Sequence, residues 1–374
     1  MPHINKQMIS FFLTTKCNLR CIYCYNSKER AMKKDITLPF EIAKAGIDYY
    51  FNNNSSRHIR FYGPGEPTQA FPLLSQITDY AKNKETTSHI TVEIQTNGVF
   101  SHKVREWMIH NMNIMWISFD GEPSIQNTNR PLPNNKKSSP IIEDNIKWMN
   151  KNKGNQNLMI GARVTITDMN MTKQKELVDY FLSLDIKHIW TDPLFPTVDK
   201  TPFNKDKVKQ ENYYFDMEKY IDHFVLAYKY AETLGVKYNS FLACNFDGIS
   251  EKHCRACTPA PHLTPDGYVS ACDMVTFGNN AHHMDCFVYG FWNKDTREFE
   301  FDYDKIKILQ SRNVENMSHC CDCKVRYQCG GYCLGEVVNE TGDLFGQKQK
   351  TCQAIQKLFK ALNAPVIKYD FTHP

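Results

Sequence analysis

Three cysteines near the start of the chain have the spacing of metal ligands. Cys17, Cys21 and Cys24 are separated by three residues and then by two. Three thiolates can hold three corners of a 4Fe–4S cube and leave the fourth iron open, as a metal must be to bind a substrate or cofactor. A zinc knuckle or a disulfide is the simpler alternative. Zinc usually takes four ligands, however, and disulfides need an even number of cysteines outside the cytosol.

The triad follows a short apolar run. Residues 8–13 are apolar except for one serine, and such a run predicts a buried strand. The loop that leaves a strand is where α/β barrels place their catalytic groups. We therefore expect the three cysteines at the functional end of a barrel.

The first 234 residues alternate predicted strands with predicted helices, which indicates a parallel sheet. The strands are expected at 8–13, 58–62, 89–94, 114–121, 158–166 and 188–194. The fourth range, 114–121, includes the residues at the exit of its strand. The helices are expected at 38–51, 70–83, 101–111, 141–150, 172–183 and 213–234. Six such units predict an α/β fold of the partial (β/α)6 TIM-like type, in a first domain over residues 1–234.

Composition argues against several function classes. The net charge is only +4 over 374 residues, without a dense basic run, so nothing points to nucleic acid. No apolar stretch approaches the length of a membrane span, and the N-terminus lacks the pattern of a signal peptide. The 14 cysteines therefore indicate metal sites in a reducing, cytoplasmic compartment.

The cysteine triad, with Tyr23 just before its third member, resembles the signature of the radical S-adenosylmethionine (radical SAM) enzymes. In that family the open iron binds the amino and carboxylate groups of SAM. An electron from the cluster then cleaves SAM to methionine and a 5′-deoxyadenosyl radical, which abstracts a hydrogen atom. The resemblance implies that Cys17, Cys21 and Cys24 are the ligands and that Tyr23 lies near the adenine.

Several strand exits carry residues that fit this resemblance. The segment Gly63-Pro64-Gly65-Glu66-Pro67 resembles the "GGEP" motif of the family, whose backbone meets the amino group of SAM, with Pro64 in place of a glycine. Related enzymes contact the ribose and methionine parts of SAM at places that correspond in this sequence to Asn97, Ser118, Asp120 and Arg130.

Arg163, on the fifth strand, is a candidate partner for the methionine carboxylate, because a guanidinium suits a carboxylate geometrically. Each of these assignments has a structural alternative. Ser118 or Asp120 can cap the next helix, and Arg163 can form an internal ion pair.

Cysteines gather again after residue 235, where the predicted alternation stops. Their spacing resembles the SPASM extension of radical SAM enzymes that modify peptides and proteins, and it assigns residues 235–374 to a second domain with two further 4Fe–4S clusters. The resemblance implies a first set of ligands made of Cys254, Cys257, Cys272 and Cys333. It implies a second set made of Cys320, Cys323, Cys329 and Cys352. Cys244 is the alternative to Cys254 in the first set. Cys286 and Cys321 are expected to be free thiols. A pair of structural zinc sites is the alternative to the whole array.

Asp273 directly follows one proposed ligand, Cys272. A matching aspartate in anaerobic sulfatase-maturing enzymes is thought to take a proton as the substrate side chain is oxidised. A carboxylate within reach of a substrate hydroxyl or thiol can act as a general base. The alternative is a carboxylate held by backbone amides near the cluster.

Together the motifs predict a radical SAM enzyme with three 4Fe–4S clusters and SAM that modifies a peptide or protein. Its electron donor would be a protein such as flavodoxin or ferredoxin. One form of this hypothesis is maturation of a small ribosomal peptide, and the other is formylglycine formation in a sulfatase. The chain has few residues before Met8 for a leader-binding domain, so substrate recognition is expected in the loops, in the cysteine-rich region or on another protein. A non-catalytic electron carrier is the rival class, but it would have no use for a SAM-binding turn at Gly65-Glu66-Pro67.

Overall fold

The computed structural model describes residues 8–27, 35–85, 88–154, 157–194, 215–243, 250–278 and 282–362. The strands are β1 (Ile9–Phe12), β2 (His58–Tyr62), β3 (Thr91–Thr96), β4 (Ile114–Ser118), β5 (Met159–Ile166), β6 (His188–Pro193), β7 (Lys237–Ser240), β8 (His262–Leu263), β9 (Tyr268–Ser270), β10 (Val288–Asn293) and β11 (Glu298–Phe301). The α-helices are α2 (Phe40–Asn53), α3 (Phe71–Lys84), α4 (His102–Asn111), α5 (Pro123–Asn129), α6 (Ser139–Asn152), α7 (Gln174–Ser183), α8 (Met217–Thr233), α9 (Tyr303–Ser311), α10 (Arg326–Cys329), α11 (Leu334–Thr341) and α12 (Gln349–Ala361).

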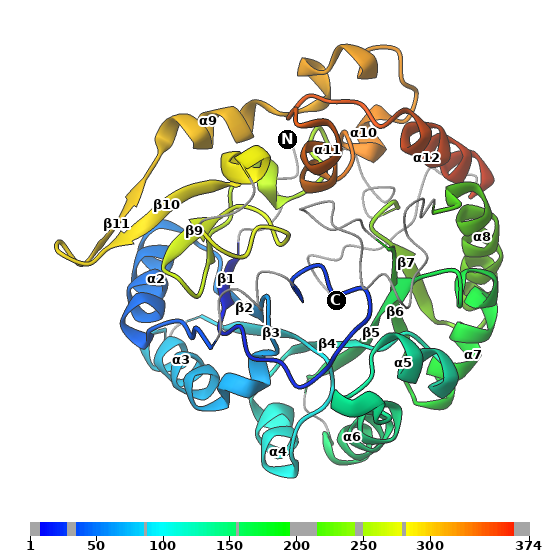
Figure 1. Cartoon of the computed structure of the whole chain (residues 1–374), viewed down its shortest axis with the longest axis horizontal. Coiled ribbons are helices and arrows are strands. Elements are labelled where there is room, and N and C mark those ends of the chain that lie inside the picture. Colours follow the sequence, from blue (N-terminus) through cyan, green and yellow to red (C-terminus); the bar gives the residue numbers. More distant parts are fainter. Residues whose placement is uncertain are drawn as a thin grey trace.

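All these strands belong to one sheet, in the order β11-β10-β9-β8-β1-β2-β3-β4-β5-β6-β7. Strands β1 to β7 are parallel to one another, as consecutive strands joined by helices must be. The sheet curves around the centre of the molecule, and helices α2 to α8 lie outside it (Figure 1). The predicted partial TIM-like barrel in the α/β class is therefore confirmed.

The six predicted strand–helix units are present, and the structure adds elements that the pattern did not predict. Strand β7 continues the parallel sheet beyond residue 234, and β8 pairs in parallel with β1. These strands span only four and two residues, too few for hydrophobic alternation to indicate a strand. The sheet thus runs across the proposed domain boundary, and the division at residue 235 stays a prediction.

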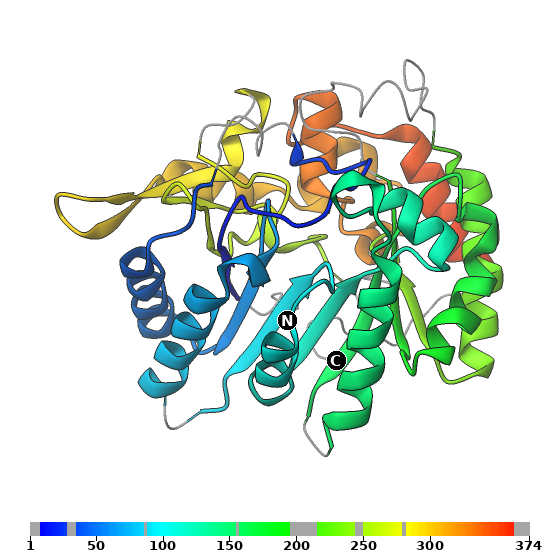
Figure 2. The same cartoon turned by 60° about the horizontal axis from the view of Figure 1, so that its bottom comes forward.

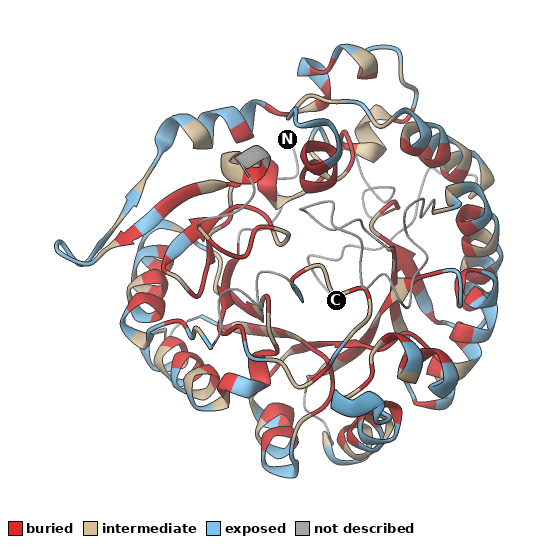
Figure 3. Ribbon diagram, in the orientation of Figure 1, coloured by how far each residue is buried: buried red, intermediate tan, exposed pale blue. Residues whose placement is uncertain are grey.

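The barrel strands alternate between two environments. On β2, Ile59 and Phe61 are fully buried in the hydrophobic core that the sheet shares with its helices. Because successive side chains point to opposite faces of a strand, His58, Arg60 and Tyr62 face the barrel interior. On β3, Glu93 faces inward in the same way, in register with Arg60. Figure 3 shows the buried sheet and the exposed outer sides of the helices.

The C-terminal elements lie over one end of the barrel. Figure 2 shows α10, α11 and α12, in orange to red, on the same side as the blue loop that follows β1. That loop carries the first cysteine triad. None of the helices in the described part of the chain is both long and apolar enough to cross a membrane.

Candidate active site

The first three cysteines lie together on the loop after β1. Burial raises the pKa of the Cys21 thiol to about 12, with Arg130 opposing this shift and the nearby Cys24 and Cys17 adding to it. All three are free thiols. A thiol must lose its proton to bind a metal, so a bound cation that replaces the proton would stabilise the buried Cys21 sulfur as a thiolate.

The Gly-Glu-Pro motif after β2 is bound to this cysteine loop. The Gly65 amide donates to the Thr14 carbonyl at 3.0 Å, and the Glu66 amide donates to the Lys16 carbonyl at 2.8 Å. A Cβ atom at residue 65 would collide with both of these carbonyl oxygens. The sequence therefore needs glycine at position 65 to let the two loops approach each other.

The side chain of Glu66 joins two strand exits. Its Oε1 accepts from the Thr68 amide at 3.1 Å and from the Thr96 hydroxyl at 2.7 Å, while Oε2 accepts from the Asn97 amide at 2.7 Å. Burial raises the pKa of this carboxyl, and the same hydrogen bonds oppose the shift. Pro67 is buried and begins the short 3-10 helix η1 (Pro67–Ala70). These hydrogen bonds of Gly65 and Glu66 thus join the motif to other residues of the protein.

Asp120, at the exit of β4, connects the cysteine loop to the barrel. Its carboxylate is fully buried and accepts hydrogen bonds from the Tyr23 hydroxyl, from Arg130 Nε at 3.2 Å, from Asn129 Nδ2 at 3.1 Å and from the Thr165 amide at 3.0 Å. The Arg130 guanidinium also lies 5.1 Å from the centre of the Tyr23 ring. Three residues that the sequence assigned to SAM contacts, Tyr23, Asp120 and Arg130, are therefore in direct contact with one another.

Asn97 and Ser118 occupy the exits of β3 and β4. Asn97 lies against the cysteine loop, where its Nδ2 donates to Asn18 Oδ1 at 2.7 Å and to Cys17 Sγ at 3.9 Å. Ser118 is 7% exposed and pairs in register with Arg163. Both residues lie at the end of the barrel where the sequence placed them.

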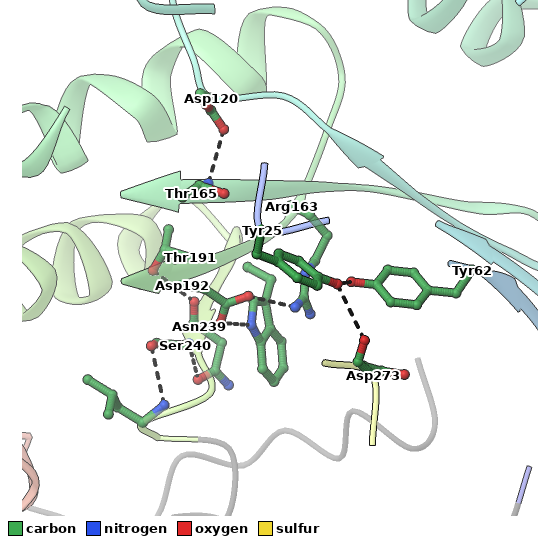
Figure 4. Close-up of polar contacts among 12 residues, drawn as sticks. Tyr25, Tyr62, Asp120, Arg163, Thr165, Thr191, Asp192, Asn239, Ser240 and Asp273 are labelled. Atoms are coloured by element: carbon green, nitrogen blue, oxygen red, sulfur yellow. Dashed lines mark hydrogen bonds and ion pairs between the residues drawn. The ribbon is translucent and has the colours of Figure 1, made fainter. Parts of the chain in front are cut away.

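Arg163 points into the barrel but is paired within the protein. Its Nη2 contacts Asp192 Oδ2 at 2.6 Å (Figure 4). Its guanidinium lies over the Trp190 ring, 4.9 Å from the ring centre. Burial raises the pKa of Asp192, and Arg163 opposes this shift. The internal ion pair that the sequence left open as an alternative is thus present in the structure.

Asp273 is held by an ion pair that sequence reasoning missed. Its two oxygens accept from Arg60 Nη1 at 2.9 and 3.0 Å, and Oδ1 lies 3.4 Å from His262 Nδ1. Burial raises the pKa of the Asp273 carboxyl, but Arg60, His262 and Arg255 outweigh burial and hold the pKa well below its usual range. Asp273 is therefore a carboxylate, about a third exposed, at the edge of the barrel interior.

Two tyrosines beside Asp273 were also missed. The hydroxyls of Tyr25 and Tyr62 lie 2.8 Å apart, and Tyr25 contacts the main-chain oxygen of Asp273 at 3.4 Å (Figure 4). Tyr25 directly follows Cys24, so the cysteine loop touches the segment that follows Cys272. The alternation of polar and apolar residues on β2 was the available signal, since it placed Arg60 and Tyr62 on the inner face.

The second cysteine array separates into two groups. In the first, Cys254 and Cys257 share a side-chain hydrogen bond. Burial raises the pKa of Cys272, and Cys333 and Cys254 add to the shift. In the second group, burial raises the pKa of Cys320 to about 11, with Cys352 and Cys323 adding to it, and the pKa of Cys329 responds in the same way to Cys352 and Cys320.

These groups contain the two sets of four cysteines that the sequence analysis proposed as ligands. Among the described residues, no three His, Cys, Asp or Glu side chains converge as ligands of a single metal ion. A 4Fe–4S cube makes a different demand, because each thiolate binds its own iron. Cys286 lies in η5 (His282–Phe287) and packs against the core, Cys321 is exposed, and Cys244 lies outside the described residues.

Comparison with known proteins finds a family match within the first half of the chain. Residues 11–174 match the radical SAM superfamily. An uncharacterised protein of Methanocaldococcus jannaschii is 33% identical over 185 residues, which cover 49% of this chain and 61% of the relative. The radical SAM cyclopropyl synthase TigE of Paramaledivibacter caminithermalis is 23% identical over 97% of this chain and 75% of its own. A cysteine-type anaerobic sulfatase-maturating enzyme of Clostridium novyi is 21% identical over 86% and 85%.

Solved structures share the fold over nearly the whole chain. Native anSMEcpe with bound AdoMet and Kp18Cys peptide superposes with a TM-score of 0.74 at 17% identity, covering 96% of this chain and 98% of the other. SuiB of Streptococcus suis bound to its precursor peptide SuiA gives a TM-score of 0.65 at 15% identity, covering 93% and 76%. At these identities the likeness concerns the fold.

Replacing Asp120 with Asn should destabilise the protein strongly. The change leaves Arg130, whose side chain is only 12% exposed, as a buried charge without its partner, which typically costs about 3–5 kcal/mol. Urea denaturation under anaerobic conditions measures the free energy of unfolding. The matched control is Asp304→Asn, which breaks a solvent-exposed pair with Lys307 and should change stability by less than about 1 kcal/mol. Equal effects of the two changes would contradict the role assigned to Asp120.

Proposed function

We propose that this chain, whose residues 11–174 match the radical SAM superfamily, is a radical SAM enzyme that modifies a residue of a peptide or protein by hydrogen abstraction. The observation that carries the peptide substrate is the likeness, over 93% and 96% of the chain, to two structures that contain peptides. The polar barrel interior, with Asp273 at its edge, supports the same proposal because a side chain of an extended peptide can reach it from the open end.

The proposed cofactors are three 4Fe–4S clusters and SAM. The ligands of the first cluster are Cys17, Cys21 and Cys24, those of the second are Cys254, Cys257, Cys272 and Cys333, and those of the third are Cys320, Cys323, Cys329 and Cys352. The residues fit these groups, because each set consists of free thiols that lie close enough to perturb one another's pKa. When bound, the first cluster supplies the electron that cleaves SAM.

The protein's own side chains fix the loop that would hold SAM. Tyr23 and Arg130 both donate to Asp120, and the Arg130 guanidinium lies over the Tyr23 ring, so these three residues set the path of the cysteine loop. We propose that the backbone of Gly65, Glu66 and Pro67, together with the side chains of Asn97 and Ser118, faces SAM.

We propose that Arg163 binds the methionine carboxylate in place of the carboxylate of Asp192. That exchange conserves the charge balance around the guanidinium, since one carboxylate replaces another. The electron reaches the protein from a donor such as flavodoxin or ferredoxin, and we place the enzyme in the cytoplasm.

Asp273 is the proposed proton acceptor. In the structure its carboxylate is neutralised by Arg60, which makes it a weak base. The pairing must therefore weaken when substrate enters, and the Tyr25 and Tyr62 hydroxyls are placed to hold the substrate side chain beside the carboxylate.

Formylglycine formation in a sulfatase is the second candidate reaction. The Clostridium novyi relative is named a cysteine-type anaerobic sulfatase-maturating enzyme, and Asp273 follows Cys272 as the resemblance to such enzymes implies. The departure at Gly63-Pro64 tells against it, because those enzymes usually carry a Gln before two glycines. The two candidates predict different substrates for the same site.

Incubation with SAM and a strong reductant should distinguish the two substrates. The candidate substrates are a short Cys- or Ser-rich peptide encoded beside this gene and a sulfatase-derived peptide with a Cys or Ser target. We expect a mass change, detected by mass spectrometry, only in the first peptide. Conversion of the second to an aldehyde that reacts with hydrazides would establish the formylglycine reaction instead. The control for both is the same incubation without SAM.

Replacing Cys17, Cys21 and Cys24 together with Ala should abolish reductive cleavage of SAM while leaving about two thirds of the iron. The reason is that only the first of three four-iron clusters loses its ligands. Iron analysis after anaerobic reconstitution and chromatography of 5′-deoxyadenosine measure the two effects. The exposed Cys321→Ala change is the control and should alter neither quantity. A triple variant that still makes 5′-deoxyadenosine would disprove the assignment.

Replacing Asp273 with Asn should preserve iron content and SAM cleavage but reduce product by roughly two to four orders of magnitude, the usual contribution of a general base. Asn keeps the shape of the side chain and loses its basicity. Product is measured by mass spectrometry and 5′-deoxyadenosine in the same samples, with Asp304→Asn as the surface control. Near-normal product would show that Asp273 serves only the ion pair with Arg60.

A further inference from the structure

One amide side chain at the barrel mouth is aimed at a sulfur of the first cysteine triad. Asn97 Nδ2 donates to Cys17 Sγ at 3.9 Å, within the range of N–H···S contacts. The same nitrogen donates its other hydrogen to Asn18 Oδ1 at 2.7 Å. Both hydrogens of this amide are therefore directed at the loop that carries Cys17.

The orientation of the Asn97 amide is fixed by its surroundings. Its Oδ1 accepts from the Val99 main-chain amide at 2.9 Å, so the nitrogen must be the atom that faces Cys17. Its own main-chain amide donates to Glu66 Oε2 at 2.7 Å, and the residue is only 7% exposed. A buried and pre-oriented donor interacts with charge more strongly than one in water, because the local dielectric constant is low.

We propose that Asn97 is a positioning residue that raises the reduction potential of the first cluster by donating a hydrogen bond to the Cys17 thiolate. This inference rests on the proposed function, which makes Cys17 a cluster ligand. Adding one electron to an iron–sulfur cluster increases the negative charge on its sulfurs, and a hydrogen bond to a sulfur stabilises the reduced form more than the oxidised form. Asn97 would thus make the cluster easier to reduce whether or not SAM is bound.

The C-terminal region provides a natural comparison. Gln356 Nε2 lies 3.6 Å from Cys323 Sγ, a proposed ligand of the third cluster. Gln356 is exposed, so water competes for its hydrogen bond and screens its dipole. The same chemical contact should therefore have a smaller effect there, and none on the first cluster.

The experiment is a potentiometric titration of the whole reconstituted enzyme, followed by electron paramagnetic resonance. Each sample is poised without SAM and then divided, and SAM is added to one half, so the SAM-sensitive part of the signal identifies the first cluster. The variants are Asn97→Asp, which keeps the acceptor for Val99 and replaces the donor with a negative oxygen, and Asn97→Leu, which removes the amide. Gln356→Leu is the matched control. Iron content and the Kd for SAM are measured for every protein.

In both Asn97 variants we expect the ratio of reduced to oxidised first cluster at a fixed potential to fall about tenfold without SAM, which corresponds to about 59 mV for a one-electron couple. Gln356→Leu should leave that ratio unchanged. A ratio within twofold of the wild type in both Asn97 variants would overturn the proposal, and a change only in the Kd for SAM would mean that Asn97 acts by touching SAM. A wild-type protein with no SAM-sensitive signal and no 5′-deoxyadenosine would reject the proposed function itself, and this inference with it.

Discussion

Two buried carboxylates hold the cysteine loop against the barrel, and the geometry of the whole site depends on them. Asp120 is fully buried and accepts from Tyr23 within the loop and from Thr165 on β5. Glu66 ties the exits of β2 and β3 together, and its neighbour Gly65 contacts the backbone of the loop. A buried carboxylate is costly unless its oxygens are hydrogen-bonded, so each of these groups stabilises only one arrangement of the loops around it. This is why a loop with little regular structure of its own can present three thiols in a fixed arrangement.

The interior of the barrel uses paired charges instead of an apolar core. Arg60 pairs with Asp273 and Glu93, and Arg163 pairs with Asp192. Such pairs contribute little net stability, because desolvation offsets much of their attraction. Their value for the proposed reaction is different, since they keep the barrel interior polar and include guanidinium groups that can exchange one carboxylate for another. The apolar residues that stabilise the fold lie on the other face of the same strands, against the helices.

The sequence predicted the barrel well because its strands and helices have strong hydrophobic periodicity. Buried strands such as β4, with its run of Ile114 to Ile117, leave little ambiguity. It did not predict β7 or β8, whose pairing is set by tertiary contacts that no local pattern encodes. The motifs predicted that Tyr23, Asp120 and Arg130 lie at one end of the barrel, but they did not predict that these residues contact one another. The pairing of Arg60 with Asp273 was beyond reach, because it joins residues 213 positions apart.

That long-range pair also explains how the C-terminal region is oriented over the barrel. Strand β8 adds to the barrel sheet beside β1, which fixes the direction of the chain that follows it. Asp273 then bonds to Arg60 on β2, while its main-chain oxygen meets Tyr25 next to Cys24. A buried arginine needs a carboxylate partner, so the segment around Cys272 and Asp273 cannot shift away from the barrel without leaving Arg60 with a weaker one, Glu93 at 3.5 Å. The two cysteine regions are therefore held at a defined separation by Asp273, the residue that we propose as the proton acceptor.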